Sequence, residues 1–393
     1  MNTSYQRFRR FAAVLVGIVF LVSGLLKMID PVGTMLILQE YFRYFQVPGL
    51  MPAAKGLGIA LSVAEAAVGV SLITGVLRKM AAVLTYVMLG FFTIVTFVLW
   101  VLNPTMDCGC FGEAVHLSHA QSFWKNVILL LLSVIAFTPF HDFGRPKRNR
   151  IVAAVLAGLS LLVVVIYSNR HLPIMDFTAF DWGAELYASL DDEVAADNHY
   201  KAAYVYEKDG KEGVFDLTAL PDSTWTFVRV DTVFRKTTAV SEDYPILSFS
   251  DADGVYHDRM AAEGNVVVLS VYDVAKAPWE RVREHYHAVL NAGGMPLVLV
   301  SAVPGDVRLP QDLPLYYADY KTLITLNRSN GGVTYLDDGL IVRKWHARAL
   351  PSEGDLSYFA GLDGIEGAVR SVNEGRLRAE GYLLYLLAVL ILL

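Results

Sequence analysis

The two cysteines of this chain, Cys108 and Cys110, are separated by a single glycine and could carry out redox chemistry together. They stand in the sequence Asp-Cys-Gly-Cys-Phe-Gly at 107–112, between two long apolar stretches. A disulfide that closes over one residue needs unusual backbone angles, which glycine tolerates best. Such a bridge is expected to be strained, and strained disulfides are the easily reduced ones that take part in exchange. The pair therefore predicts a redox-active or structural disulfide.

Two alternatives remain open for the same residues. The cysteines could be free thiols in a tight turn. They could also form half of a metal site completed by His116 and His119, but Cys-x-Cys followed by His-x-x-His is sparser than an established zinc signature. We predict no bound metal.

The composition indicates an integral membrane protein with a second, chemically different part. Hydrophobic residues make up 54% of the chain and charged residues 18%. Residues 1–168 hold thirteen basic and six acidic residues, a net charge of +7, whereas residues 169–378 hold twenty basic and thirty-two acidic ones, a net charge of −12. The first part predicts a partner in the lipid bilayer, and we expect no nucleic-acid partner.

Five apolar segments are long enough to cross a bilayer, at about 20 residues each. They are residues 11–28, 56–77, 80–102, 122–140 and 151–168. A sixth apolar segment, residues 379–393, is short and crosses only if the residues before it continue its helix. Residues 29–55 have apolar residues at helical spacing between prolines, which predicts an amphipathic helix packed against the spans.

The basic residues predict the orientation. Nine of them flank the spans on one side: Arg7, Arg9, Arg10, Arg78, Lys79, Arg145, Lys147, Arg148 and Arg150. Four are on the other side: Lys27, Arg43, Lys55 and Lys125. Positively charged loops stay in the cytoplasm, so the N-terminus is predicted to be cytoplasmic. The cysteine loop and residues 169–378 then face the periplasm of a bacterial inner membrane, where disulfides persist.

Two ionisable residues lie within or beside the spans. Glu65 is near the middle of the second span, where a charged carboxylate is costly, so we expect it to be buried and either protonated or paired. It could contact a quinone or relay protons, or it could simply hydrogen-bond Thr85 or Thr93. Lys27, at the end of the first span, is explained by snorkelling of its ammonium group to the interface.

The acidic part divides into two regions. Residues 169–245 predict a β-rich region, with a hairpin at 204–211 turning at Asp209-Gly210 and a strand at 225–228. From 246 to 378 the pattern is α/β: buried strands at 266–272 and 296–300, a helix at 278–292 whose first residue is Pro278, a hairpin at 332–345 and a last helix from about 363.

This order of elements resembles the thioredoxin-like fold over about 100 residues. In that family, a Cys-x-x-Cys motif lies between the first central strand and its helix, and a cis-proline precedes the hairpin. Here these positions are 273–279, which has no cysteine, and Asn330-Gly331-Gly332. The resemblance therefore implies a thioredoxin-like domain without the family's redox chemistry.

The membrane part resembles the DoxX-like family and, within it, the methylamine-utilisation MauE group. The matching residues are Gly17, Phe20, Ser23, Gly24, Lys27, Asp30 and Pro31 in and after the first span, Glu65 in the second, and Cys-Gly-Cys-Phe-Gly at 108–112. With its outer domain, the chain looks like the larger DoxX-type proteins of Bacteroidetes. The resemblance implies a four-helix core, here joined by a fifth span, and a role in periplasmic thiol chemistry or protein maturation.

Three hypotheses follow for the function. Cys108 and Cys110 could be the catalytic pair of a thiol–disulfide oxidoreductase that exchanges electrons with a periplasmic thiol protein and a membrane acceptor, such as a quinone near Glu65. Alternatively, the chain could be a non-enzymatic scaffold whose thioredoxin-like domain binds an envelope protein. A transporter is a third possibility, supported only by Glu65 and few other polar residues in the spans.

Overall fold

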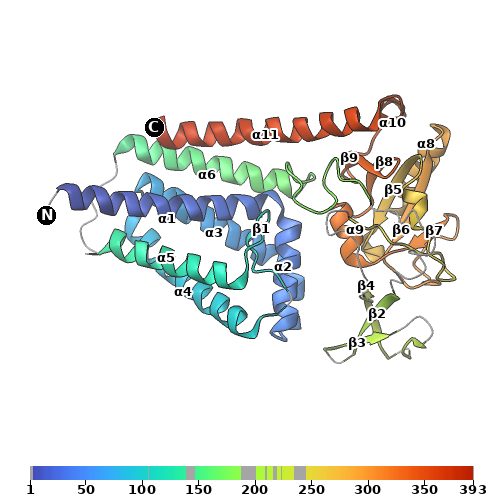
Figure 1. Ribbon diagram of the computed structural model, residues 1–393, viewed down its shortest axis with the longest axis horizontal. Coiled ribbons are helices and arrows are strands. Elements are labelled where there is room, and N and C mark those ends of the chain that lie inside the picture. The colour runs from blue at the N-terminus through green and yellow to red at the C-terminus, as the bar shows by residue number, and fades with distance from the viewer. Residues whose placement is uncertain are drawn as a thin grey trace. The chain divides into compact units, whose positions relative to one another are not determined.

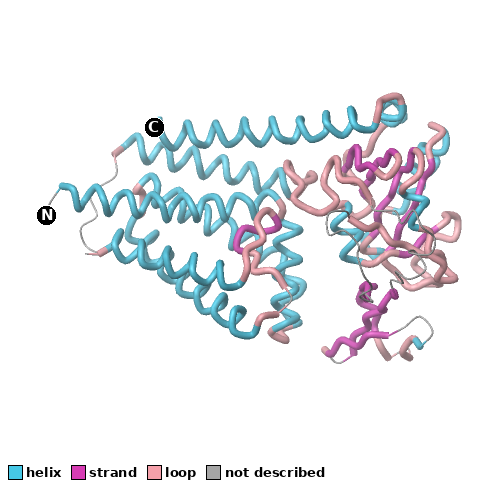
Figure 2. Tube along the Cα trace, viewed as in Figure 1, coloured by secondary structure: helices cyan, strands magenta, loops and turns pink. Residues whose placement is uncertain are grey.

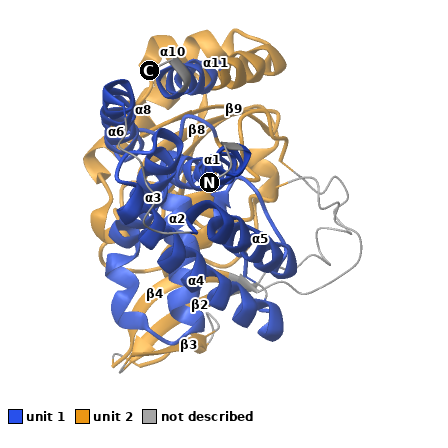
Figure 3. Ribbon diagram, turned by 90° about the vertical axis from the view of Figure 1, so that its left-hand side faces the viewer, with its two compact units in different colours: residues 1–175, 377–393 blue, residues 176–376 orange. Residues whose placement is uncertain are grey.

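The computed structural model describes residues 3–104, 106–138, 147–186, 201–208, 210–215, 219–222, 224–233 and 245–392. The chain divides into two compact units (Figure 3). The helical unit comprises residues 1–175 and 377–393, and the α/β unit comprises residues 176–376. The second unit is therefore an insertion in the chain of the first.

Five helices of the helical unit are long and apolar enough to cross a membrane, which confirms the five predicted spans (Figure 1). They are α1 (Thr3–Ile29), α3 (Ala54–Thr74), preceded by the 3-10 helix η1 (Pro48–Ala53), α4 (Arg78–Leu102), α5 (His119–Phe137) and α6 (Arg148–Ser168). The helix ends follow local signals. Gly75 ends α3 in the left-handed conformation, and Ser118 with Gln121 forms a capping box at the start of α5.

Three glycines allow α1 and α3 to pack backbone against backbone. A Cβ atom on Gly24 would lie 2.6 Å from the Ala66 nitrogen, and one on Gly69 would lie 2.5 Å from the Leu21 nitrogen. Gly17 is also crowded, with Leu72 Cβ at 2.9 Å. Any side chain at these positions would force the two helices apart. This close contact fixes the registry of the residues that α1 and α3 contribute to the site.

The predicted amphipathic segment forms a shorter helix, α2 (Pro31–Tyr44). Asp30 caps it by accepting a hydrogen bond from the Gly33 nitrogen at 2.9 Å, and Pro31 occupies its first turn. The helix ends before Gln46, which has a φ of 55°. The chain then continues into η1 and α3.

The last helix, α11 (Gly364–Leu392), is continuous from the α/β unit into the helical unit. Residues before 379 thus continue the helix of the short apolar segment 379–393, which is what that segment would need to cross a bilayer. Within the helical unit, Leu386 and Val389 belong to a buried cluster with residues of α1, α3 and α6. The five candidate spans among the described residues do not include α11.

The α/β unit contains two sheets (Figure 2). The first has the order β3-β2-β4 and consists of β2 (Lys201–Lys208), β3 (Lys211–Phe215) and β4 (Thr226–Val233), all antiparallel. This confirms the predicted hairpin and strand. Gly210 in the turn has a φ of 76°, and Asp209 lies outside the described residues.

The second sheet has the order β7-β6-β5-β8-β9. It consists of β5 (Asn265–Val271), β6 (Met295–Val300), β7 (Leu315–Tyr317), β8 (Gly332–Asp337) and β9 (Leu340–Trp345). The first three of these pair in parallel, and β8 and β9 pair antiparallel. Alternate residues of β5 enter two different cores, with Val266 in one and Val267 in the other. Burial on both faces explains why the strand is continuously apolar.

Helices cover this sheet: α8 (Trp279–Asn291), α9 (Tyr320–Leu326) and α10 (Glu353–Ala360). The predicted helix at 278–292 is confirmed, except that Pro278 is its N-cap rather than its first residue. Three elements were not predicted from the sequence, β7, α9 and α10, and each is eight residues or shorter. Such short elements show too few residues for a periodic pattern to stand out.

Candidate functional site

The cysteine loop lies between α4 and α5 and enters a short strand, β1 (Cys110–Glu113). Gly109 has a φ of 63°, and a Cβ atom there would lie 2.5 Å from Ile37 Cγ2 of α2. Both the backbone angle and the contact require glycine between the cysteines. On the same side, the Tyr41 hydroxyl donates a hydrogen bond to the Cys108 carbonyl at 2.8 Å. Thus α2 holds the loop in place.

The two cysteines are free thiols whose Sγ atoms lie 3.0 Å apart. Cys108 is buried and Cys110 is half-buried. The structure therefore shows the reduced pair in hydrogen-bond contact. It brings together the two groups that a disulfide would join.

The two thiols differ in acidity. The hydrogen bond from Cys108, together with the positive charges of Lys125 and Lys27, lowers the pKa of Cys110 to about 5, although burial opposes the shift. The same hydrogen bond, followed by burial, raises the pKa of Cys108 far above that of an ordinary thiol. The pair therefore loses its first proton more readily than an ordinary thiol does, and the charges of Lys125 and Lys27 favour Cys110 as the thiolate.

Glu65 and Lys27 form an ion pair inside the helical unit. Lys27 Nζ lies 2.7 Å from Glu65 Oε1 and 2.8 Å from Oε2. The prediction that Glu65 is buried and paired is confirmed, since the residue is 1% exposed. Snorkelling of Lys27 was the wrong explanation, because the residue is 5% exposed and its ammonium group points to Glu65 instead of the interface.

The alternative partners considered for Glu65 were also wrong. Thr85 and Thr93 each donate a hydrogen bond to the carbonyl four residues earlier in α4. The partner on α1, besides Lys27, is Ser23, whose hydroxyl lies 2.8 Å from Glu65 Oε2. Ser23 and Lys27 are four residues apart and share one face of the helix.

Ser23 also connects the ion pair to the cysteine loop. Its hydroxyl lies 2.7 Å from the Cys110 carbonyl oxygen and 2.8 Å from the Glu65 carboxylate. A hydroxyl has one hydrogen to donate, so Ser23 can donate to only one of these acceptors at a time. A continuous polar chain thus runs from Lys27 through Glu65 and Ser23 to the backbone of Cys110.

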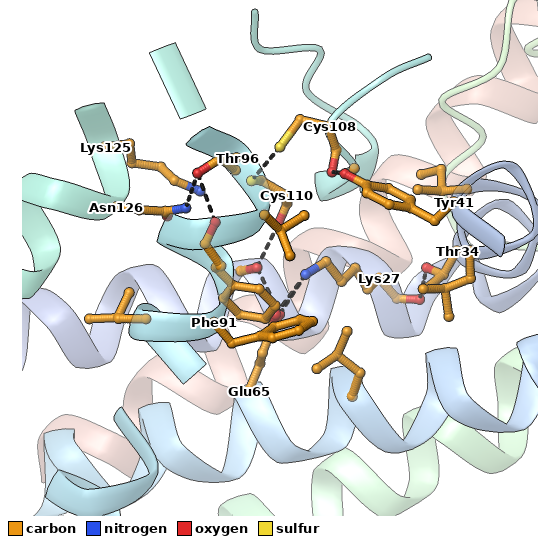
Figure 4. Close-up of a pocket in the computed structure, with 18 of the residues that line it drawn as sticks. Lys27, Thr34, Tyr41, Glu65, Phe91, Thr96, Cys108, Cys110, Lys125 and Asn126 are labelled. Carbon is orange, nitrogen blue, oxygen red and sulfur yellow. Dashed lines mark hydrogen bonds and ion pairs between the residues drawn. The ribbon is translucent and has the colours of Figure 1, made fainter. Parts of the chain in front are cut away.

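These groups surround one cavity of about 320 Å³ (Figure 4). In the close-up, the two thiols lie above Lys27 and Glu65, and Lys125 and Asn126 of α5 lie to the left of the thiols. Most of the remaining lining is apolar: Val19, Phe20, Ile37, Leu38, Phe42, Phe45, Val47, Leu50, Leu61, Leu89, Phe91, Phe92, Val95 and Leu129. For residues 29–55, ordinary packing against the spans was expected rather than a substrate lid, and side chains of α2 also form part of this lining.

The histidines of the metal alternative have other contacts. His116 Nδ1 lies 3.1 Å from Asp107 Oδ2, and His119 Nε2 lies 3.0 Å from the Pro104 carbonyl oxygen. Among the described residues, no three His, Cys, Asp or Glu side chains form a group that could hold a metal ion.

Three residues of the site were not recognised as functional from the sequence: Tyr41, Ser23 and Lys125. Ser23 did carry a signal, because it precedes Lys27 by one helical turn. Tyr41 and Lys125 carried none, since their approach to the loop depends on how α2 and α5 pack around it.

Comparison with known proteins gives two family matches. Residues 200–236 match a domain family of unknown function, and this range contains β2, β3 and β4. Searches of curated proteins and of solved structures found no match. The five apolar helices make the chain a membrane protein. Residues 6–139, which include Lys27, Glu65, Cys108 and Cys110, match the family of the methylamine utilisation protein MauE.

Proposed function

We propose that the helical unit exchanges disulfides with thiol proteins of the periplasm through Cys108 and Cys110. The observation that carries this proposal is the 3.0 Å contact between two thiols of the same loop. The polar chain of Ser23, Glu65 and Lys27 reaches the backbone of Cys110 in that loop. The match to the MauE family supports a membrane setting. The excess of basic residues flanking the opposite ends of the spans supports a loop on the outer side of a bacterial inner membrane.

The different acidities of the thiols favour the oxidising direction. A low pKa at Cys110 stabilises the reduced pair as a thiolate. The disulfide of a pair whose reduced form is stable is a strong oxidant. In the exchange, a client thiolate attacks Sγ of Cys108, the Cys108–Cys110 bond breaks, and Cys110 leaves as the thiolate. A second client thiolate then attacks the mixed disulfide. The client gains a disulfide, and Cys108 leaves as a thiolate that takes up one proton.

We further propose that residues 246–378 form a thioredoxin-like domain that binds a partner without redox chemistry. The sheet order β7-β6-β5-β8-β9 supports this assignment. So does the Asn330 side chain, which bonds both backbone groups of Asp273, at 2.9 Å to its nitrogen and 2.8 Å to its carbonyl oxygen. In the thioredoxin-like family, the position of Asn330 belongs to the segment of the cis-proline, and that of Asp273 to the start of the Cys-x-x-Cys segment.

Trapping of mixed disulfides tests the redox proposal. The full-length Cys110→Ser variant keeps Cys108, which an oxidised client or oxidised glutathione can attach to, but it lacks the thiol that releases the adduct. We expect adducts on this variant in non-reducing gels of alkylated membranes. We expect fewer on Cys108→Ser, because an adduct at Cys110 has a good leaving group.

The double variant Cys108→Ser with Cys110→Ser is the control and should form no adduct. Adducts confined to Cys108→Ser would reverse the assigned roles. If neither single variant forms an adduct and both behave as wild type, the cysteines do not exchange disulfides.

A further inference from the structure

The cavity beside the cysteines has the size and chemistry of a ligand site. Its volume of about 320 Å³ is at the lower end of the range of small-molecule pockets, roughly 300–1,000 Å³. Most of its wall is apolar or aromatic, including Phe92 and Val95 of α4. The polar groups converge near the thiols: Ser23, Lys27, Glu65 and Lys125. A ligand that fits must be mostly apolar, with a few acceptor atoms.

The lining reaches the outer surface of the helical unit. Phe91 lines the cavity and is 60% exposed, and Phe45 of the segment after α2 is 44% exposed. The part of Phe91 outside the cavity belongs to a transmembrane helix, where the surrounding medium is lipid. A ligand of this cavity is therefore expected to be a molecule that dissolves in the bilayer and enters from it.

The inner end of the cavity offers hydrogen-bond donors to such a molecule. An ammonium group has three N–H donors, and the two Glu65 oxygens are its acceptors among the described residues, at 2.7 and 2.8 Å. Lys27 can therefore donate its third hydrogen to a carbonyl oxygen in the cavity. Lys125, whose Nζ lies 4.6 Å from the centre of the Phe111 ring, provides a second positive charge beside Cys110.

We infer that the cavity binds the ring of a membrane quinone and that this quinone takes two electrons from Cys108 and Cys110. The inference rests on the proposed disulfide exchange, since it names the acceptor that re-forms the bond. A quinone ring has two carbonyl acceptors on a flat apolar frame and usually an apolar tail. A flavin or nicotinamide cofactor is a poorer fit, because its phosphates need a binding loop that the sequence lacks.

The electrons and protons of this reaction balance with the two thiols, the quinone and one proton from water. The Cys108 S–H bond breaks and an S–S bond forms between Cys108 and the Cys110 thiolate, which releases two electrons and one proton. The quinone takes up both electrons, that proton and one more from water, and becomes the quinol. Lys27 stabilises the negative charge that develops on the ring oxygen during the transfer.

A cavity-filling variant and a matched control test the inference. Val95→Phe places a larger side chain in the cavity, and Val101→Phe makes the same change on α4 at a position that is 64% exposed and outside the lining. The reduced full-length protein in lipid nanodiscs is mixed with decylubiquinone, whose fully substituted ring does not alkylate thiols. Quinone loss is followed by absorbance and disulfide formation by alkylation and mass shift.

We expect wild type and Val101→Phe to reduce the quinone at equal rates and the rate constant of Val95→Phe to be at least about tenfold lower. All three proteins should exchange equally fast with oxidised glutathione, because that reaction depends on the reactivity of the thiols and not on the cavity. Equal quinone rates in Val95→Phe and wild type would place the reaction elsewhere. Exchange with glutathione but no quinone reduction in wild type would overturn the quinone site and leave disulfide exchange standing. If wild type does not exchange with glutathione either, both proposals fail.

Discussion

Lys27 Nζ lies 2.7 Å from Glu65 Oε1, and the two side chains are 6% and 2% exposed. They come from α1 and α3, which the close glycine contacts hold in a fixed registry. A buried ion pair stabilises a fold less than its Coulomb energy suggests, because both charges lose their hydration. Removing one partner destabilises the fold more than replacing both, since the other charge is then left buried without compensation.

The ion pair can be tested by a double-mutant cycle. We expect Lys27→Met to destabilise the helical unit by about 3–5 kcal/mol, because the Glu65 carboxylate loses its countercharge. Lys27→Met combined with Glu65→Gln should recover most of this loss. Thermal unfolding of the full chain in detergent measures the four proteins of the cycle. Additive effects of the two substitutions would mean that the side chains are not coupled.

The acidity of Cys110 predicts how its reactivity depends on pH. Alkylation of the reduced wild-type protein should fall with a midpoint at about pH 5, because the thiolate persists down to that pH. Replacing Lys125 by Met should move the midpoint upward, whereas Lys79→Met, at an exposed position in the first turn of α4, should not. A midpoint at the pH of an ordinary thiol would show that Cys110 is not activated.

The same shift links folding stability to pH. The folded pKa of Cys110 is lower than the ordinary thiol value of 9.0, so the unfolded chain binds more protons between about pH 5 and 9.0. The stabilisation by the thiolate is therefore complete above pH 9.0 and is lost as the pH falls towards 5. The difference in Tm between reduced wild type and Cys110→Ser should shrink over that range.

Gly109 should tolerate substitution less well than its neighbour in the loop. Both Gly109 and Gly112 have positive φ angles, 63° and 64°, so alanine strains both by about 1 kcal/mol. Only at Gly109 does the new Cβ collide, 2.5 Å from Ile37, whereas at Gly112 the nearest contact is at 3.6 Å. We expect Gly109→Ala to disrupt the thiol contact and slow glutathione exchange, and Gly112→Ala to retain it. Equal rates in the two variants would contradict this.

The predicted orientation can be measured by labelling introduced cysteines in the Cys108→Ser, Cys110→Ser background. In intact inner-membrane spheroplasts, Lys208→Cys should react with a membrane-impermeant maleimide and Lys147→Cys should not. Both positions are exposed, so accessibility to water is matched. The opposite labelling pattern would invert the topology.

In the α/β unit, Asn330→Ala should lower the free energy of unfolding by about 1–3 kcal/mol, because two backbone groups of Asp273 lose their partner. Asn291→Ala, at the exposed end of α8, is the control and should change it by less than about 0.5 kcal/mol. Neither substitution should alter the rate of disulfide exchange. A loss of exchange in Asn330→Ala would connect this unit to the thiol chemistry.

The long elements could be predicted from the sequence because their patterns extend over many residues. The five spans and the strand at 265–271 are mostly apolar over their whole length. Such patterns are typical of segments that are buried on both faces or surrounded by lipid. The site could be predicted only in part. Cys108, Cys110 and Glu65 attract notice by their residue types, in a chain with two cysteines and a carboxylate within a span.

The pairing of Lys27 with Glu65 could not be read from the sequence. A lysine at the end of an apolar segment has the same local pattern whether it reaches outward to the interface or inward to a partner. The direction is decided by the registry of α1 against α3, which depends on a contact between residues about forty positions apart. The same holds for Tyr41 and Cys108, which are 67 positions apart.

The continuous helix α11 also sets an order for assembly. Leu386 and Val389 pack into the cluster that contains Leu21 and Leu25 of α1, yet the ribosome makes them only after the whole α/β unit. During synthesis we expect the surface of α1 that later contacts α11 to be covered by lipid or a chaperone until the roughly 200 residues of the α/β unit have been made. The bundle can therefore be completed only after the inserted unit has been synthesised. We expect substitutions at Leu386 to lower the yield of assembled protein more than they change the chemistry at Cys108.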